Sequence, residues 1–151
     1  NRKAHDLPEV LLRSIPYMQP RISQQVELIP PPALDEAIVV KLSDSLMAWV
    51  FENLIKNAVD AMSGKGQISF AYVFKDQWVY IDITDTGKGS AKGMQRRIFH
   101  PGVSTRQRGW GLGLSLARRI VEEYHRGHIY VKHSEVGVGT TFRIELRREM
   151  E

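Results

Sequence analysis

The stretch that decides the fold runs from residue 52 to residue 61 and reads Glu-Asn-Leu-Ile-Lys-Asn-Ala-Val-Asp-Ala. Apolar residues recur through it and ahead of it at helical spacing, which predicts a helix from Ser43 or Asp44 to about Met62. These apolar residues are Leu46, Val50, Leu54, Ala58 and Ala61.

Three polar residues, Asn53, Asn57 and Asp60, follow one another at spacings of four and three, so they share one face of this helix. They lie beside the apolar stripe, and an unpaired buried amide costs about 1–3 kcal/mol. The side chains therefore either brace neighbouring backbone or face a ligand. Magnesium prefers oxygen ligands and keeps several waters, so the amide oxygen of Asn57 together with a triphosphate is a reasonable site for it.

Working outward, the remaining segments predict one two-layer domain. A helix follows Asp6, its candidate cap, and Pro16 is expected to break or kink it. A second helix is expected over 114–124, and a long loop over 85–113 with one helical turn near 94–98. Strands are expected at 25–29, 37–42, 67–74, 78–84, 128–134 and 141–146. This order predicts an α/β (α+β) fold, with a mixed, mostly antiparallel sheet and helices on one face.

Glycine-rich segments interrupt this pattern at three places. Asp85-Thr86-Gly87-Lys88-Gly89 follows a strand, so its carboxylate could accept a hydrogen bond from an exocyclic amine such as that of adenine; an ordinary turn is the alternative. Gly109-Trp110-Gly111-Leu112-Gly113-Leu114 opens a helix and could cradle phosphate, or serve only as a hinge. Gly137-Val138-Gly139-Thr140 fits a hairpin turn, although Thr140 could also support Asp85 through a water.

Bulk properties exclude several classes of protein. The 151 residues are 42% hydrophobic and 25% charged, which fits one globular domain. The absence of cysteine excludes disulfides and a cysteine nucleophile. The net charge of +4 comes without a nucleic-acid-binding motif, so we expect no nucleic-acid partner. The chain begins with Asn1 rather than methionine, and we expect it to be a piece of a longer protein.

Taken together and in this order, the motifs resemble the ATP-binding family that groups gyrase, Hsp90, histidine kinases and MutL. The resemblance extends from about Leu7 to Arg148, and it implies the Bergerat-type fold with a long ATP lid. It implies Mg²⁺ at Asn57, catalytic roles for Asn53, Asn57 and Arg106, and lid contacts that include Phe99. The ATP-binding residues that it implies are Asn53, Lys56, Asn57, Asp60, Asp85, Gly87, Gly89, Ile98, Gly109, Gly111, Leu112, Gly113, Leu114 and Thr140.

One position separates the branches of this family. In the gyrase and Hsp90 branches, a glutamate one turn before the metal-binding asparagine activates water. Here that place is held by Asn53, and an amide cannot accept a proton as a general base. Glu52 is the nearest carboxylate, but it is rotated about 100° around the helix. The pattern therefore resembles histidine kinases; a hydrolysing ATPase, a serine-directed kinase and a non-catalytic nucleotide-binding module are the alternatives.

The resemblance also implies which other domains and partners accompany this chain. Residues 1–6 are expected to be the end of a linker, and residues 7–151 the catalytic domain. The phosphoacceptor histidine is expected on a separate dimeric helical domain, with a response regulator receiver domain downstream and a homodimer formed only by the full-length protein. His5 is interpreted as part of the linker, and the other four histidines as surface residues. We expect a cytoplasmic domain, in a protein that an inner-membrane segment could anchor.

Overall fold

The computed structural model describes residues 2–91, 94–100 and 113–149 of the chain. Its helices are α1 (Leu7–Met18), the short 3₁₀ helix η1 (Gln19–Arg21), α2 (Asp44–Ala61), α3 (Met94–Arg97), α4 (Gly113–Arg119) and the π-helical turn η2 (Ile120–Tyr124). Its strands are β1 (Lys3–Asp6), β2 (Val26–Ile29), β3 (Val39–Leu42), β4 (Gly66–Lys75), β5 (Trp78–Asp85), β6 (His128–Glu135) and β7 (Gly139–Arg147).

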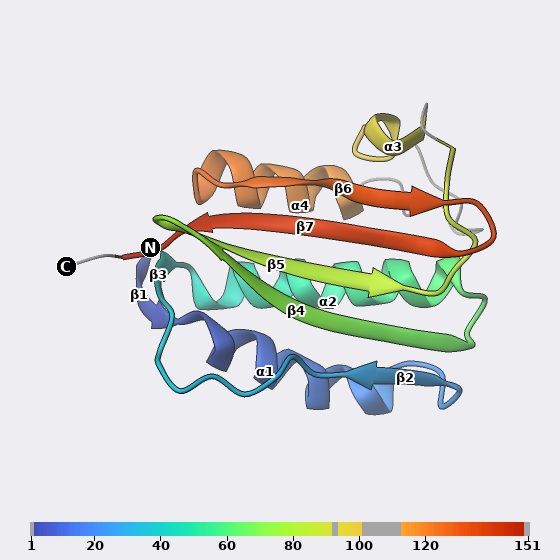
Figure 1. The fold of residues 1–151 in the computed structure, drawn as a ribbon, viewed down its shortest axis with the longest axis horizontal. Helices are drawn as coiled ribbons and strands as arrows, with labels where there is room; N and C mark the ends of the chain where they lie inside the picture. Colours follow the sequence, from blue (N-terminus) through green and yellow to red (C-terminus); the bar gives the residue numbers. More distant parts are fainter. Residues whose placement is uncertain (1, 92–93, 101–112, 150–151) are drawn as a thin grey trace.

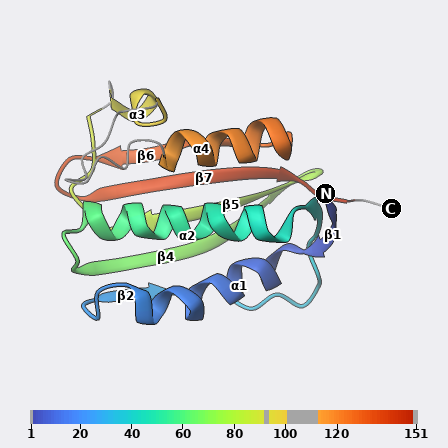
Figure 2. The ribbon, with the colours of Figure 1, turned by 180° about the vertical axis from the view of Figure 1, so that it is seen from behind.

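The main sheet has five strands in the order β2-β4-β5-β7-β6. Among the described strands of this sheet, β2 and β4 pair in parallel, and the other neighbours are antiparallel. In Figure 1 the sheet lies in front of α2 and α4, and Figure 2 shows the same helices from the other side. The two-layer α/β fold with helices on one face, expected from the sequence, is confirmed. No helix in the described part is long and apolar enough to cross a bilayer.

The core lies between the inner face of the sheet and the helices. Alternate residues of β5 and β7 point inward, and α2 covers them with its apolar side. The apolar residues that recur every second position in the strands therefore pack against those that recur every 3.6 positions in the helix. Fully buried members include Phe51, Leu54 and Ile55 of α2, and Ile68, Ile81 and Ile144 of the sheet. Burying a large aliphatic side chain stabilises the fold by about 1.5–3 kcal/mol. This packing fixes the polar face of α2 relative to the end of β5.

Several local expectations need correction. The strand expected at 37–42 is β3 (Val39–Leu42), but it leaves the main sheet and pairs with β1, which lies in the segment expected to be linker. Asp6 stands at the N-cap of α1 without capping it, because its Oδ1 accepts the backbone N–H of Ile38 at 2.8 Å. Pro16 does not break α1, which continues to Met18. By contrast, Ser43 caps α2 as expected, through the N–H of Leu46.

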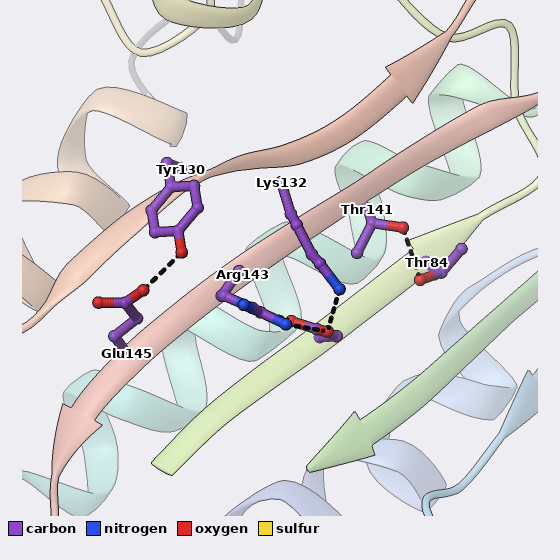
Figure 3. A network of polar contacts seen from close by, with 7 residues as sticks. Thr84, Tyr130, Lys132, Thr141, Arg143 and Glu145 are labelled. Atoms are coloured by element: carbon purple, nitrogen blue, oxygen red, sulfur yellow. Dashed lines mark hydrogen bonds and ion pairs between the residues drawn. The ribbon is translucent and has the colours of Figure 1, made fainter. Parts of the chain in front are cut away.

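The outer face of the sheet carries a polar network, shown in Figure 3. Asp82, 7% exposed, accepts two hydrogen bonds from Arg143 at 2.8 and 2.9 Å, and Lys132 lies 3.5 Å from the same carboxylate. A buried carboxylate needs such partners, because its desolvation is otherwise costly. On the same face Thr84 and Thr141 pair through their hydroxyls at 2.8 Å. These polar side chains explain why no described helix packs on this face.

Tyr72 on β4 is expected to be a weak point of the core. Its hydroxyl is buried without a hydrogen-bond partner in the described part of the chain, and burial, together with the nearby Asp6 carboxylate, raises the pKa of Tyr72 to about 12. Tyr72→Phe should therefore raise the free energy of unfolding by about 1 kcal/mol, since an unpaired buried hydroxyl is removed. Urea unfolding measures this change. The control is Tyr130→Phe, which loses a bond to Glu145; a Tyr72→Phe variant less stable than that control would contradict the expectation.

His125 is the one of the four internal histidines that departs from the expected surface position. It is 5% exposed, its Nε2 accepts the N–H of Ser43 at 3.0 Å, and its Nδ1 lies 2.8 Å from the carbonyl of Ile120. A carbonyl only accepts, so Nδ1 carries the proton and the ring is neutral. The ring thus joins the start of α2 to the π-helical turn after α4. Burial lowers the pKa of His125 below its usual value.

This arrangement predicts acid sensitivity. The unfolded chain binds a proton at His125 near pH 6.5, whereas the folded chain resists it until lower pH. The stability contribution of His125 is therefore complete above about pH 6.5 and falls as the pH drops toward the lowered folded-state pKa. Unfolding free energies from pH 7.5 to 5 should decline less steeply in His125→Gln than in the unmodified protein. The exposed His133→Gln serves as control; an equal slope in His125→Gln would exclude this role.

Candidate functional site

The end of β5 places a buried carboxylate at one end of the sheet. Asp85 is 3% exposed, and its Oδ1 accepts the backbone N–H of Gly87 at 2.8 Å. Burial raises the pKa of the Asp85 carboxyl, and hydrogen bonds from the backbone of Gly87 and Thr140 oppose that rise. The carboxylate is thus held in one orientation by its own loop. It can accept a further hydrogen bond from a ligand that reaches this end of the sheet.

The loop after Asp85 is fixed between α2 and the β6–β7 turn. Lys88 donates its backbone N–H to the carbonyl of Ala61 at 3.0 Å, and its own carbonyl accepts the N–H of Gly137 at 2.8 Å. Gly89 has a φ of +67°, and a Cβ there would lie 2.1 Å from the carbonyl oxygen of Glu135. Glycine is therefore required at this position. This contact brings the first and last glycine segments together beside the last turn of α2.

Thr140 lies opposite Asp85 in the β5–β7 register and is 9% exposed. Its Oγ1 is 2.7 Å from the Oγ of Ser134, which accepts the N–H of Ser90 at 2.8 Å. Ser90 and Ser134 belong to none of the motifs found in the sequence. Only the strand register, which includes a β-bulge in β6, brings Ser134 to this place. The sequence pattern carries no signal for that bulge.

The polar face of α2 becomes more exposed toward its C-terminus. Asn53 is 7% exposed, and its Nδ2 donates to the carbonyl of Gly113, the first residue of α4, at 3.0 Å. A Cβ on Gly113 would lie 2.9 Å from the Asn53 amide, so the two residues are in direct contact. Asn57 is half-buried, one turn before Ala61, while Asp60 and Lys56 are exposed. Asn53 thus braces backbone, and Asn57 is the more accessible amide.

Glu52 faces a different part of the molecule. It is half-buried and lines a groove between α1 and α2, together with Val10, Ser14 and Ala48. The groove lies on the side of α2 that packs against α1, whereas Asn53 contacts α4. The separation of these two side chains around the helix, expected from the sequence, is therefore present in the structure.

The remaining predicted residues fall into two groups. Ile98 and Leu114 are half-buried and pack against the hydrophobic core, and Phe99 is buried edge-to-face against Phe142. The helical turn expected near 94–98 is α3. The others lie outside the described residues, so their contacts stay predictions: Arg106, Gly109, Gly111 and Leu112.

The arrangement combines a fixed hydrogen-bond acceptor with neutral oxygens. Asp85 and Thr140 offer polar groups at the base of the site, and the Asn57 amide lies one turn from the loop that holds them. Among the described residues, no group of three or more His, Asp or Glu side chains is placed to hold a metal ion. A cation here would need oxygens brought by the ligand, as a metal-bound triphosphate provides.

Comparison with known proteins agrees with this geometry. The catalytic domain of histidine kinase ThkA superposes with a TM-score of 0.85 at 23% identity, covering 98% of this chain and 96% of that one. ThkA in complex with the response regulator protein TrrA gives a TM-score of 0.82 at 22% identity, covering 98% of this chain and 42% of that one. The fold is thus that of histidine kinase catalytic domains.

Proteins that are similar to this chain in sequence also carry the names of kinases. The adaptive-response sensory kinase SasA of Prochlorococcus marinus strain AS9601 is 44% identical over 102 residues, 64% of this chain and 27% of the relative. Sporulation kinase E of Bacillus subtilis strain 168 is 35% identical over 126 residues, 83% of this chain and 16% of the relative. The chain thus spans about a quarter or less of these relatives' length.

Residues 43–150 match the family model described as histidine kinase-, DNA gyrase B- and HSP90-like ATPase. The matched segment begins at the Ser43 cap of α2 and includes Asn57, Asp85 and Thr140, the three residues that approach the candidate site. The chain therefore belongs to the histidine kinase-, DNA gyrase B- and HSP90-like ATPase family.

Proposed function

We propose that this chain binds Mg-ATP and is the catalytic domain of a sensor histidine kinase, which transfers the γ-phosphate to a histidine on a separate helical domain. The observation that carries the proposal is the polar face of α2. The position one turn before Asn57 holds an amide that is engaged with Gly113, and Glu52 faces the α1 groove. Because position 53 holds an amide and no general base, the rate of attack by water lacks the contribution of about 10²–10⁴-fold that such a base would give. The γ-phosphate is kept for a protein acceptor.

The adenine end of the site rests on Asp85. Its carboxylate accepts the exocyclic amine of the base, and the bond from Gly87 holds the carboxylate in place. Thr140 lies opposite Asp85 in the strand register, and its hydroxyl is proposed to bind a ring nitrogen of the adenine base. Lys56, Asp60 and Arg106 are proposed to act near the phosphates, as are the glycines that precede α4.

Magnesium fits the donors that the chain provides. Asn57 is half-buried and supplies one neutral oxygen, and the rest of the coordination shell would come from phosphate and water. The ion would neutralise charge on the phosphates during transfer. The chain's own part is to hold the nucleotide in position, which is the main requirement of phosphoryl transfer.

The partners follow from the same proposal. We infer a helical phosphoacceptor and dimerisation domain attached ahead of residue 7, with full-length protein as a homodimer, and a receiver domain that takes the phosphate onward. The name of the ThkA–TrrA complex supports the second partner by similarity. Pairing of β1 with β3 means that residues 3–6 enter the domain along a fixed direction. We place the domain in the cytoplasm, whatever the membrane attachment of the whole protein.

Phosphate chemistry tests the proposal. The protein that carries this domain is incubated with Mg-ATP labelled at the γ-phosphate, and the phosphorylated product is treated with acid and with base. A phosphohistidine should be lost in acid and survive base. A product that survives acid would indicate a serine-directed kinase instead, and label released only as inorganic phosphate would indicate an ATPase.

A further inference from the structure

A β-bulge in β6 turns Ser134 toward the nucleotide end of the core. Up to Val131 the register is regular, with Ile129 opposite Ile144 and Val131 opposite Phe142, all on the inner face. The register then shifts between Val131 and His133, so that Ser134 rather than His133 lies opposite Thr140. Because side chains alternate along a strand, one extra residue reverses the facing of those that follow. The bulge therefore brings the Ser134 hydroxyl to the inner face.

The contacts around Ser134 allow its hydroxyl to donate to Thr140. Its Oγ accepts the backbone N–H of Ser90 at 2.8 Å, which uses one acceptor site. Its single proton has three possible acceptors: Thr140 Oγ1 at 2.7 Å, Ser90 Oγ at 3.3 Å and the Gly139 carbonyl at 3.4 Å. The Thr140 oxygen is the nearest of the three, at the distance that is commonest for hydrogen bonds between hydroxyls. Either hydroxyl could donate across this contact, and donation by Ser134 leaves the proton of Thr140 free.

We propose that Ser134 is a specificity-determining residue, which fixes Thr140 as a hydrogen-bond donor to the purine base. The inference rests on the proposed binding of ATP at Asp85. When Thr140 Oγ1 accepts from Ser134, its own proton is free to point into the site. Adenine offers an amine donor and, beside it, the N1 acceptor. The acceptor Asp85 and the donor Thr140 lie opposite each other in the register and match that pair of groups, directly or through one bridging water.

The probe is 1-deaza-ATP, which keeps the exocyclic amine and the triphosphate but lacks the N1 acceptor. The unmodified protein should bind ATP about tenfold more tightly than 1-deaza-ATP, because the analogue leaves a buried donor unpaired. In Ser134→Ala the Thr140 hydroxyl can turn, and the ratio of the two Kd values should fall to about threefold or less. Ser134→Thr keeps the hydroxyl and should restore the ratio. Calorimetry measures each Kd, and a ratio within one variant is independent of its folded fraction.

Thr141→Val is the matched control. Thr141 is the next residue of β7 and also pairs with another hydroxyl, that of Thr84, but on the outer face of the sheet (Figure 3). It should leave the ratio at about tenfold. In a Thr140→Val background, adding Ser134→Ala should change the ratio no further, because the two residues act as one unit. A Ser134→Ala protein that retains the full preference for ATP would overturn the inference. Failure of the unmodified protein to bind ATP would instead refute the proposed function.

Discussion

Asn57→Ala should remove nearly all of the thermal stabilisation that we expect Mg-ATP to give this domain. A ligand at 100 times its Kd stabilises the folded state by about 2.7 kcal/mol, which is about 5–10 °C in Tm for a domain of this size. If loss of the Asn57 oxygen from the cation lowers the affinity about 100-fold, the remaining shift is about 1 °C. Thermal unfolding with and without Mg-ATP measures both values. The unliganded variant should fold, because alanine favours a helix and Asn57 is only half-buried.

Glu52→Ala is the control for that experiment. Glu52 is half-buried on the same helix but lines the groove toward α1, so its removal should leave the Mg-ATP shift intact. An unchanged shift in Asn57→Ala would remove Asn57 from the metal site. Loss of the shift in Glu52→Ala instead would place the phosphates on the other side of α2.

Asp85→Asn is expected to weaken ATP binding about 100-fold while leaving inorganic triphosphate unaffected. The asparagine oxygen can still accept the N–H of Gly87, so its NH₂ group is directed at the amine of adenine, and two donors then face each other. A charged hydrogen bond is lost and a buried donor is left unpaired, which together cost about 2–4 kcal/mol. Competition binding with ATP, ITP and inorganic triphosphate separates a loss of affinity for the base from a loss of affinity for the phosphates. ITP, which offers an oxygen in place of the amine, should lose least among the nucleotides.

The matched control is Asp76→Asn, at the exposed turn between β4 and β5, where asparagine tolerates the positive φ of 56°. It should bind all three ligands as the unmodified protein does. Equal losses for ATP and inorganic triphosphate in Asp85→Asn would contradict contact with the base.

The sequence predicted the two layers of the fold because apolar residues recur in its helices and strands with a clear period. The apolar repeat of α2 and the alternation in β4 and β5 each point to one buried face, and those faces pack together in the structure. What it could not predict depends on contacts between distant segments. β3 leaves the main sheet because β1 offers it a partner, and Asp6 binds Ile38 rather than capping α1. The apolar periodicity of a sequence does not show whether a polar group forms its hydrogen bond with a local or a distant partner.

For the candidate site, the sequence predicted which motifs would lie close together, while their contacts with a ligand stay predictions. Asp85, Gly87, Gly89 and Thr140 were singled out from glycine motifs far apart in the sequence, and the fold brings them together. Ser134 was missed, because its inward facing depends on a one-residue register shift in β6. His125 was assigned to the surface because a lone histidine after a helix gives no sign of the buried N–H of Ser43 that it accepts.

The most direct test is to measure nucleotide binding and phosphate release on one sample of the isolated chain. With an amide, Asn53, where a general base would stand, the chain should bind one Mg-ATP yet release inorganic phosphate more slowly than about 0.1 per second, well below the usual 1–10³ per second of enzymes. Release faster than about 1 per second with no partner protein present would contradict the account.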